Sequence, residues 1–252
     1  MATPSQTSQG SERLELASVV AVVTGGSRGI GFAIASALVS SGARVVITGR
    51  DAQQLQDARK QLEQSRSGAV HAVAADVGRP DEAARAIDAV AEKFGGLDVL
   101  VNNAGVGKFA NVAEMTIEQW QQTMDTNLSG VFYCCRAAIP HLKRRGRGWI
   151  INISSLAGSN PFTGGAAYCA SKAGLNVFSE ALMQEVRHDN IRVSCIAPGS
   201  VGTGFAGRGS SGEADWKIAP QDVAELVLDL VTFPSRSLPS RIELRPSRPK
   251  KA

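Results

Sequence analysis

Short apolar runs alternate with longer stretches of helical periodicity along most of this 252-residue chain. A short run rich in β-branched residues is typical of a strand buried on both faces, and apolar side chains that recur every three to four residues are typical of an amphipathic helix. Strands are expected at residues 18–23, 44–48, 70–74, 99–101, 149–153, 191–196 and 241–244. Helices are expected at residues 30–39, 52–64, 81–94, 116–145, 167–188 and 221–231.

This alternation predicts an α/β fold, a doubly wound parallel sheet between two layers of helices, in a single domain. Parallel strands need crossover connections, and these are right-handed, so helices cover both faces of the sheet. We expect the domain to span residues 17–245, after a disordered lead-in at residues 1–16 and before a basic extended tail at residues 246–252. In such folds ligands bind beyond the carboxyl ends of the strands.

Composition argues against several other classes of protein. No apolar run approaches the roughly 18 residues that span a bilayer, so we expect no membrane insertion. The net charge of +4 is not accompanied by a recognisable nucleic-acid-reading element, so we expect no nucleic-acid partner. The N-terminal segment lacks the apolar core of a secretory signal, and the four cysteines lack metal-ligand spacing. We therefore expect a cytoplasmic protein with reduced thiols and no metal.

The first predicted strand runs directly into a glycine-rich turn. Gly25 allows a sharp change of direction, Gly29 lets the backbone approach a phosphate, and Gly31 lets the next helix pack closely on the strand. The free N–H groups of that helix would face a pyrophosphate. An ordinary glycine turn is the alternative, but the position at the first strand–helix junction favours a dinucleotide site. The expected contacts are Gly25, Ser27, Arg28, Gly29, Ile30 and Gly31.

The end of the second predicted strand indicates which dinucleotide is bound. NAD-binding sheets generally place a carboxylate here for the adenosine ribose. This chain has Gly49 at that position, followed by Arg50. A guanidinium suits the 2′-phosphate of NADP, and Arg28 from the glycine-rich turn could reach the same group. We therefore expect NADP(H), with NAD(H) as the alternative if both arginines are only surface residues.

The helix expected after the fifth strand opens with Tyr168-Cys169-Ala170-Ser171-Lys172. Residues four apart share one helix face, so the phenol of Tyr168 and the ammonium of Lys172 can act on one ligand. A nearby buried ammonium would lower the pKa of the phenol from its usual value near 10. Ser155, at the end of the fifth strand, adds a hydroxyl to this pair. An exposed helix face is the alternative for an isolated Tyr/Lys pair.

Taken in order, these motifs resemble those of the short-chain dehydrogenase/reductase family, which has a Rossmann fold. The resemblance extends from about residue 19 to residue 231. It rests on Thr24-Gly25-x-x-x-Gly29-x-Gly31, Asp76, Asn102-Asn103-Ala104-Gly105, Asn127, Ser155, Tyr168-x-x-x-Lys172 and Pro198-Gly199. Each motif follows a predicted strand or lies in a predicted helix, in the family's order, which makes coincidence a poor explanation.

The resemblance implies a role for each catalytic candidate. Ser155 would hydrogen-bond the substrate oxygen, and Tyr168 would donate or accept its proton. Lys172 would lower the pKa of Tyr168 and hold the nicotinamide ribose. Asn127 would bend the long helix and hold a water that relays protons through Lys172. Ser154 competes with Ser155 for the first role, but the spacing to Tyr168 favours Ser155.

The resemblance also implies further cofactor contacts. Asp76 and Val77 resemble the residues that contact the adenine ring. The segment Asn103-Ala104-Gly105 resembles the one that supports the adenosine ribose and the central sheet. The segment Pro198-Gly199-Ser200-Val201-Gly202-Thr203 resembles a nicotinamide clamp, with the Val201 backbone and the Thr203 hydroxyl near the carboxamide. Ordinary turn chemistry is the alternative for Asp76 and Asn103.

Together these groups describe hydride transfer with general acid–base assistance. We expect NADPH-dependent reduction of a small-molecule carbonyl, a ketone that could be of the 3-oxoacyl type, to a secondary alcohol. One alternative is NAD-dependent oxidation of a secondary alcohol, which Gly49-Arg50 opposes. Another is a non-enzymatic module that senses a dinucleotide, which the complete set of Ser155, Tyr168 and Lys172 opposes. The resemblance further implies a homodimer or homotetramer that pairs the helices expected at residues 116–145 and 167–188.

Two segments depart from the family's pattern. Residues 204–219 are rich in glycine and serine where many relatives have longer helices, so we expect a short, mobile lid over an open pocket. Phe109, Phe162, Phe205 and Trp216 could line that pocket or could belong to the core. The C-terminal end has prolines and basic residues in place of a glycine-rich turn. We expect it to be solvated, with a contact to a neighbouring subunit as the alternative.

Overall fold

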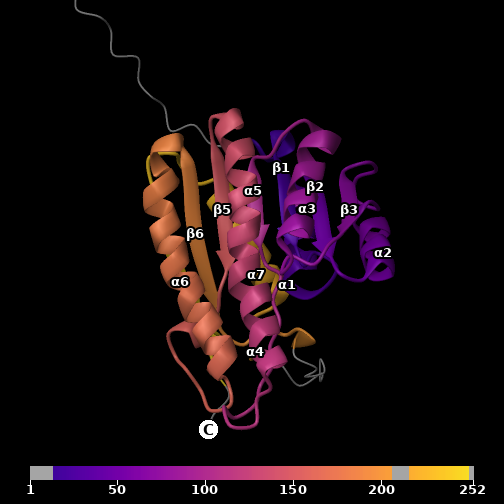
Figure 1. Cartoon of the computed structure of the whole chain (residues 1–252). Coiled ribbons are helices and arrows are strands. Elements are labelled where there is room, and N and C mark those ends of the chain that lie inside the picture. Colours follow the sequence, from indigo (N-terminus) through magenta and orange to yellow (C-terminus); the bar gives the residue numbers. More distant parts are fainter. Residues whose placement is uncertain (1–13, 206–215, 250–252) are drawn as a thin grey trace, which may run out of the picture.

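The computed structural model describes residues 14–205 and 216–249, and in this part of the chain seven strands form one parallel sheet (Figure 1). The strand order is β3-β2-β1-β4-β5-β6-β7, and each neighbouring pair is parallel. The strands are β1 (Val20–Thr24), β2 (Arg44–Gly49), β3 (Val70–Ala74), β4 (Val99–Asn102), β5 (Gly148–Ile153), β6 (Ile191–Pro198) and β7 (Arg241–Leu244). The chain order reverses between β1 and β4, which is where a doubly wound sheet opens a crevice for ligands.

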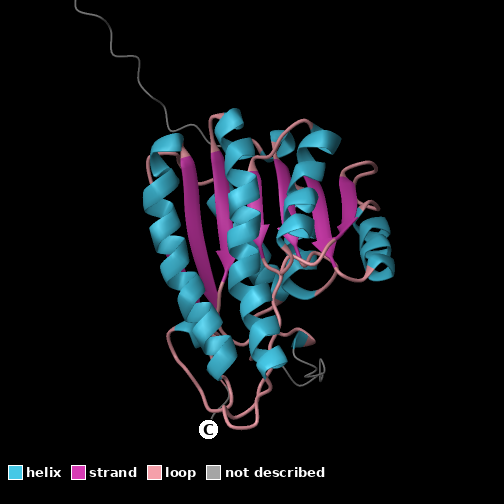
Figure 2. Ribbon diagram, in the orientation of Figure 1, coloured by secondary structure: helices cyan, strands magenta, loops and turns pink. Residues whose placement is uncertain are grey.

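Helices cover both faces of this sheet, which confirms the predicted three-layer fold (Figure 2). The helices are α1 (Gly29–Ser40), α2 (Ala52–Leu62), α3 (Pro80–Phe94), α4 (Ile117–Met124), α5 (Gly130–Arg145), α6 (Ala166–Val186) and α7 (Pro220–Val231). One core cluster joins α1, α2 and α7 to one face, and a second joins α3, α5 and α6 to the other. Successive residues of β1 alternate between the two clusters, because side chains of a strand point to opposite faces.

Two elements differ from the sequence-based expectation. The helix expected at residues 116–145 is interrupted by a π-helical turn at Asp125–Ser129, where the Gly130 N–H donates to the Asp125 carbonyl. The strand expected from residue 18 begins at Val20, because Leu16–Ser18 forms a 3₁₀ turn. Leu14, within the expected lead-in, is buried in the core cluster that contains α1 and α7. The expected lid falls mostly outside the described residues, between residues 205 and 216.

A buried carboxylate fixes the amino ends of the central strands. Asp98, directly before β4, has a side chain that is 1% exposed. Its Oδ2 accepts hydrogen bonds from the Val20 backbone N–H (2.9 Å) and from Arg145 Nη2 (2.8 Å), and its Oδ1 accepts one from Arg145 Nε (3.0 Å). Arg145 is the last residue of α5, so this two-point ion pair ties the end of that helix to β1 and β4.

Replacing this carboxylate by an amide tests its contribution. We expect Asp98→Asn to lower the free energy of unfolding by about 2 kcal/mol. The amide N–H₂ would then face the Val20 N–H or the Arg145 guanidinium, and these groups would lose the carboxylate oxygen to which they donate. Urea unfolding followed by circular dichroism measures the change. The matched control is Glu63→Gln in the more exposed Arg59–Glu63 pair, where we expect a loss of about 0.5 kcal/mol. Equal losses in the two variants would contradict a special role for Asp98.

Candidate active site

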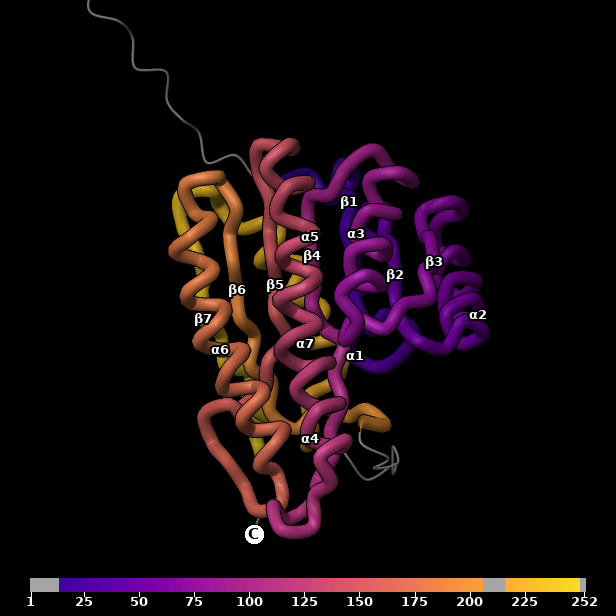
Figure 3. The backbone as a smooth tube through the Cα atoms, viewed as in Figure 1, coloured from indigo at the N-terminus to yellow at the C-terminus, as the bar shows by residue number. Residues whose placement is uncertain are grey.

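The loops that follow β1, β4, β5 and β6 meet at the carboxyl edge of the sheet. Parallel strands present these ends on the same side, and Figure 3 traces α4 to the same, lower end of the molecule. Most of the sequence-predicted site residues lie on these loops or at the starts of α1 and α6. Arg50 follows β2, Asp76 and Val77 follow β3, and Asn127 lies in the π-helical turn between α4 and α5. Residues far apart in the sequence are thereby brought together.

The turn after β1 is shaped by glycines that no other residue could replace without strain. Gly25 and Gly29 have left-handed φ angles of 64° and 56°. A Cβ on Gly31 would lie 2.2 Å from the Gly25 carbonyl oxygen, so the start of α1 packs directly on the turn. Asn103 Nδ2 holds the turn from the β4 side by donating to the Thr24 and Gly25 carbonyls, at 2.9 and 3.1 Å. The result is a backbone cradle at the amino end of α1, suited to a phosphate.

The two arginines expected to bind a 2′-phosphate are exposed at this end. The side chains of Arg28 and Arg50 have no hydrogen bond or ion pair with another residue in residues 14–205 and 216–249. Ser27 Oγ donates to Gln54 Oε1 at 3.0 Å, which places the glycine turn beside the start of α2. Gly49 has no left-handed φ, and a Cβ there would make only ordinary contacts at 3.5 Å or more. The fold therefore does not require a glycine at position 49.

The turn after β3 carries Asp76 and Val77. Asp76 Oδ1 accepts a hydrogen bond from the Gly78 N–H at 3.0 Å, and the Asp76 N–H donates to Glu82 Oε2 at 2.8 Å. Val77 is 6% exposed and packs in the core cluster that contains α3 and α5. Only the Asp76 side chain and the backbone of this turn are therefore open to a ligand.

The segment after β6 lies against the glycine turn. The nearest atom to a Cβ on Gly29 would be the Thr203 methyl group, at 3.3 Å. Val201 forms an isolated parallel bridge with Ile218, and the Gly199 N–H donates to the Leu244 carbonyl at 2.8 Å. Pro198 ends β6 and pairs with Leu244. Thr203 and the Val201 backbone therefore lie near the cradle, whereas Pro198 and Gly199 are directed to β7.

A serine and a tyrosine share a hydrogen bond beyond the end of β5. Ser155 Oγ accepts from the Ala157 N–H at 3.2 Å as it caps a 3₁₀ turn, and it also bonds the Tyr168 hydroxyl. Ser154, the competing candidate, is 4% exposed, and its hydroxyl donates to Asn176 Oδ1 at 2.6 Å. The structure thus places Ser155 beside the phenol and directs Ser154 toward α6.

Lys172 lies one turn after Tyr168 and is almost fully buried. Its Nζ donates to the Ile153 carbonyl at 2.8 Å and lies 5.9 Å from the centroid of the Tyr168 ring. Burial lowers the pKa of Lys172 to about 8. Burial raises the pKa of the Tyr168 phenol, and the hydrogen bond with Ser155 only partly opposes that rise. The pKa of Tyr168 is therefore raised and not lowered as expected, because desolvation of the phenol is the largest influence on it.

Asn127 lies in the π-helical turn and is fully buried. Its Oδ1 accepts from the Val106 N–H at 2.8 Å, and its Nδ2 donates to the Val106 carbonyl at 2.9 Å and to Ser171 Oγ at 3.0 Å. Ser171 Oγ in turn donates to the Tyr168 carbonyl at 2.8 Å. The Asn127 side chain thus joins the loop after β4 to the start of α6, and the π-helical interruption of the expected long helix occurs where Asn127 lies.

Ala104 and Gly105 complete the loop between these groups. The Ala104 N–H donates to Thr24 Oγ1 at 3.0 Å, which ties the loop to β1. A Cβ on Gly105 would lie 3.4 Å from Asn127 Oδ1 and 3.9 Å from Lys172 Nζ. The sequence reasoning missed Ser171 and Asn176 as supporting residues. Their spacing from Tyr168 and Lys172 on one helix was the available signal.

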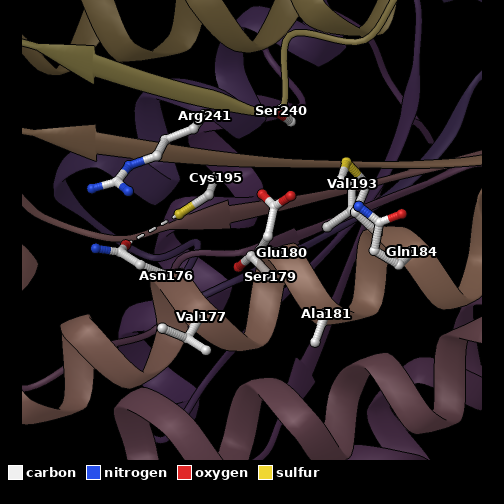
Figure 4. A pocket seen from close by; sticks show the side chains of 11 residues that line it. Asn176, Val177, Ser179, Glu180, Ala181, Gln184, Val193, Cys195, Ser240 and Arg241 are labelled. Carbon is white, nitrogen blue, oxygen red and sulfur yellow. Dashed lines mark hydrogen bonds between the residues drawn. The ribbon is translucent and has the colours of Figure 1, made fainter.

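A separate cavity of about 510 Å³ lies between α6 and strands β6 and β7 (Figure 4). In its floor, Cys195 Sγ donates to Asn176 Oδ1 at 3.4 Å. Glu180 and Arg241 stand on its walls. Ser155, Tyr168 and Lys172 are not among the described residues that line it. The chemistry predicted from the sequence therefore belongs to the carboxyl edge of the sheet and not to this cavity.

Two further findings concern the described residues. None of their helices is long and apolar enough to cross a membrane. No group of three or more histidine, cysteine, aspartate or glutamate side chains in this part of the chain is placed to hold a metal ion.

Comparison with known proteins gives a consistent result. A family model described as short chain dehydrogenase matches residues 19–214. An uncharacterized oxidoreductase of Staphylococcus saprophyticus is 34% identical, over 92% of this chain and 99% of that protein. The crystal structure of a metagenomic short-chain oxidoreductase in complex with NADP is 39% identical, with a TM-score of 0.82 and coverage of 94% of this chain and 100% of that one. An alcohol dehydrogenase from the archaeon Thermococcus sibiricus, complexed with 5-hydroxy-NADP, is 30% identical, with a TM-score of 0.84 and coverage of 92% and 99%.

The burial of Lys172 leads to a pH-dependent prediction. We expect its ammonium to titrate near pH 8 in the folded chain and near 10.4 after unfolding in urea. The unfolded chain then holds more protons between these two values. Burial of the Lys172 ammonium therefore destabilises the folded chain fully below pH 8, and this destabilisation decreases as pH rises through this window.

NMR of ¹³C-labelled lysine side chains measures this titration. The Lys172→Arg variant assigns the signal, because only the resonance of Lys172 disappears from its spectrum. A folded-state titration at the ordinary lysine value would contradict the burial of this ammonium.

Proposed function

This chain belongs to the short-chain dehydrogenase family of oxidoreductases, and we propose that it uses NADPH to reduce the carbonyl of a small ketone to a secondary alcohol. The single observation that carries the proposal is the hydrogen-bonded pair of Ser155 and Tyr168, with the buried ammonium of Lys172 one turn away. Hydride transfer to a carbonyl needs a proton donor at the oxygen, and a phenol beside a hydroxyl supplies one.

The glycine cradle fits a dinucleotide. The left-handed Gly25 and Gly29 leave backbone N–H groups at the amino end of α1, and a Cβ on Gly29 would meet only Thr203 within 4 Å. Bound NADPH would supply the hydride, while the chain would bind and orient it. The cradle and Ile30 would hold the phosphates of NADPH. The Asp76 turn and the Asn103–Gly105 loop would hold its adenosine, and the Thr203 segment would hold its nicotinamide. The Pro198-Gly199 pair would hold the Thr203 segment in position.

The second strand end favours NADP over NAD. Gly49 carries no carboxylate to repel a phosphate. The backbone at this position could hold a larger residue, so the fold does not require a glycine there. The exposed guanidinium groups of Arg28 and Arg50 are available for paired bonds to a 2′-phosphate. The related structures with NADP and 5-hydroxy-NADP support the same choice. NAD-dependent oxidation of an alcohol remains the less supported function.

The raised pKa of Tyr168 is consistent with reduction. At neutral pH the phenol keeps its proton, which is the form that a general acid requires. Ser155 would hold the substrate oxygen, and Tyr168 would transfer its proton to that oxygen as the hydride arrives. Lys172 would hold the nicotinamide ribose, and Asn127 would position the first turn of α6 through Ser171. A dinucleotide sensor would have no need of this proton donor.

We also propose that the protein is a cytoplasmic homodimer or homotetramer. The outward side chains of α5 and α6 include Phe132, 46% exposed, and Val177, 72% exposed. Large apolar residues exposed on two neighbouring helices are favourable for burial against a second copy. Sedimentation velocity measures the assembly directly, and a monomer at micromolar concentration would contradict it.

Removing the proposed proton donor tests the function. We expect Tyr168→Phe to lower kcat by about 10²–10⁴-fold, with the dissociation constant for NADPH almost unchanged, because only the hydroxyl is lost. NADPH consumption over a panel of ketones measures the rate, and fluorescence titration measures binding. The control is Tyr133→Phe at the other of the two tyrosines, which should keep full activity. Undiminished turnover by Tyr168→Phe would refute the assignment.

Reversing the charge beside the second strand tests the choice of cofactor. We expect Arg50→Asp to weaken NADPH binding by about 10–100-fold and NADH binding much less, because only NADPH has the 2′-phosphate. Titration with each cofactor gives both constants. The control is Arg187→Asp, which makes the same change of charge at the carboxyl end of α6. It should leave the ratio of the NADPH and NADH dissociation constants unchanged. Equal weakening of both cofactors by Arg50→Asp would mean that Arg50 does not contact the 2′-phosphate.

A further inference from the structure

Two phenylalanine rings from separate segments pack against the ring of Tyr168, and a third packs against one of these two. The Phe109 ring centroid lies 5.7 Å from that of Tyr168, with the planes at 78°, and the Phe205 centroid lies 5.8 Å from it, with the planes at 53°. The Phe162 centroid lies 5.7 Å from that of Phe109. Phe109 follows β4, Phe162 precedes α6 and Phe205 follows β6. We call Phe109, Phe162 and Phe205 the aromatic frame.

Two glycines make room for these rings. A Cβ on Gly107 would lie 2.8 Å from Phe205 Cε1 and 2.9 Å from Phe109 Cζ, and a Cβ on Gly165 would lie 2.6 Å from Phe162 Cε2. Neither glycine has a left-handed φ, so the backbone does not require glycine at either position. The missing side chains instead let the rings pack against the loops. The positions of the rings are therefore built into the backbone around them.

The aromatic frame leaves apolar surface open beside the phenol. Phe162 is 45% exposed and Phe205 is 38% exposed, although large aromatic side chains are usually buried. An exposed apolar patch beside convergent polar groups is typical of a ligand site. Here the polar groups are the hydroxyls of Ser155 and Tyr168. A ligand with an apolar body and one oxygen would satisfy both parts of the site.

The geometry favours a flat ring over a flexible chain. Phe162 and Phe205 are partly exposed, and a further aromatic ring packed edge-to-face on them at centroid separations of about 4.5–7 Å would make attractive contacts. A saturated ring of similar size lacks the aromatic quadrupole, so it cannot make the same edge-to-face contacts. A flexible acyl chain would lose rotamer freedom on binding, which a rigid ring does not.

We propose that the substrate is a ketone whose carbonyl carries an aromatic ring, with the ring held by the aromatic frame and the oxygen held by Ser155 and Tyr168. This inference rests on the proposed function, because the carbonyl must reach the phenol that protonates it. It also narrows the expected substrate class, since an aryl ketone replaces the 3-oxoacyl chain. Phe162 and Phe205 are specificity-determining residues that contact the substrate away from its reacting atoms.

The first experiment compares acetophenone with cyclohexyl methyl ketone in NADPH consumption. Conjugation changes the intrinsic reactivity of acetophenone, so the informative quantity is the change in the aryl-to-cyclohexyl ratio of kcat/KM between variants. We expect Phe162→Leu and Phe205→Leu each to lower this ratio by about tenfold, because leucine keeps apolar contact but removes the ring. Phe94→Leu is the matched control, since Phe94 is the last residue of α3, at the opposite edge of the sheet, and it should leave the ratio unchanged.

The second experiment measures binding without turnover. In the Tyr168→Phe background with NADP⁺ present, isothermal titration should show 1-phenylethanol binding about tenfold more tightly than 1-cyclohexylethanol. Adding Phe205→Leu should remove this preference. Both experiments use the full chain, and circular dichroism of each variant checks that it is folded.

The outcomes separate the two proposals. Ketone reduction with ratios that the aromatic-frame variants do not change would overturn the aryl-ketone inference and leave the reductase function in place. A binding preference for the phenyl alcohol that Phe205→Leu removes would support the aromatic frame even if neither ketone were reduced, and the reductase proposal would then fail alone. Equal binding of the two alcohols would overturn the inference whatever the rates.

Discussion

The hydrogen bond from the buried Lys172 ammonium to the Ile153 carbonyl, 2.8 Å long, is the contact on which the arrangement of the site depends. It joins the first turns of α6 to the last residue of β5. Because Ser155 follows β5 and Tyr168 lies one turn before Lys172, this contact brings the serine and tyrosine side chains together. Burying an ammonium is costly, and its pKa falls to about 8 as a result. The same ammonium thus helps to position the serine–tyrosine pair and has a pKa that its own burial lowers.

Buried polar networks behind this contact restrict the neighbouring elements. Asn102 Nδ2 donates to Asn152 Oδ1 at 2.8 Å, and Asn152 Nδ2 donates to Ser179 Oγ at 2.8 Å, so β4, β5 and α6 are joined in the interior. Asn102 Oδ1 and the Thr48 hydroxyl are buried without a partner among the described residues. Networks of this kind accept few alternative packings, because an unpaired buried polar atom costs free energy. They support the narrow range of positions that proton transfer tolerates.

The two ends of the proposed reaction use different kinds of contact. The cofactor end relies on backbone, with left-handed Gly25 and Gly29 and the close approach of Gly31, and on exposed guanidinium groups. The proposed substrate end relies on aromatic side chains from three loops. Membership of the short-chain dehydrogenase family accounts for the first end, since the fold provides the cradle. It does not determine the second, because one fold can carry many substrate sites on its loops.

The sequence by itself determined the order of strands and helices, the glycine turn and the pairing of Tyr168 with Lys172 on one helix face, because these depend on local periodicity and spacing. Only the tertiary structure decided that Ser155 and not Ser154 faces the phenol, that burial raises the pKa of Tyr168, and that the rings of Phe109 and Phe205 pack against it. These features depend on segments far apart in the chain. Side-chain direction at a strand end and desolvation are set by the packed neighbours, which no local pattern specifies.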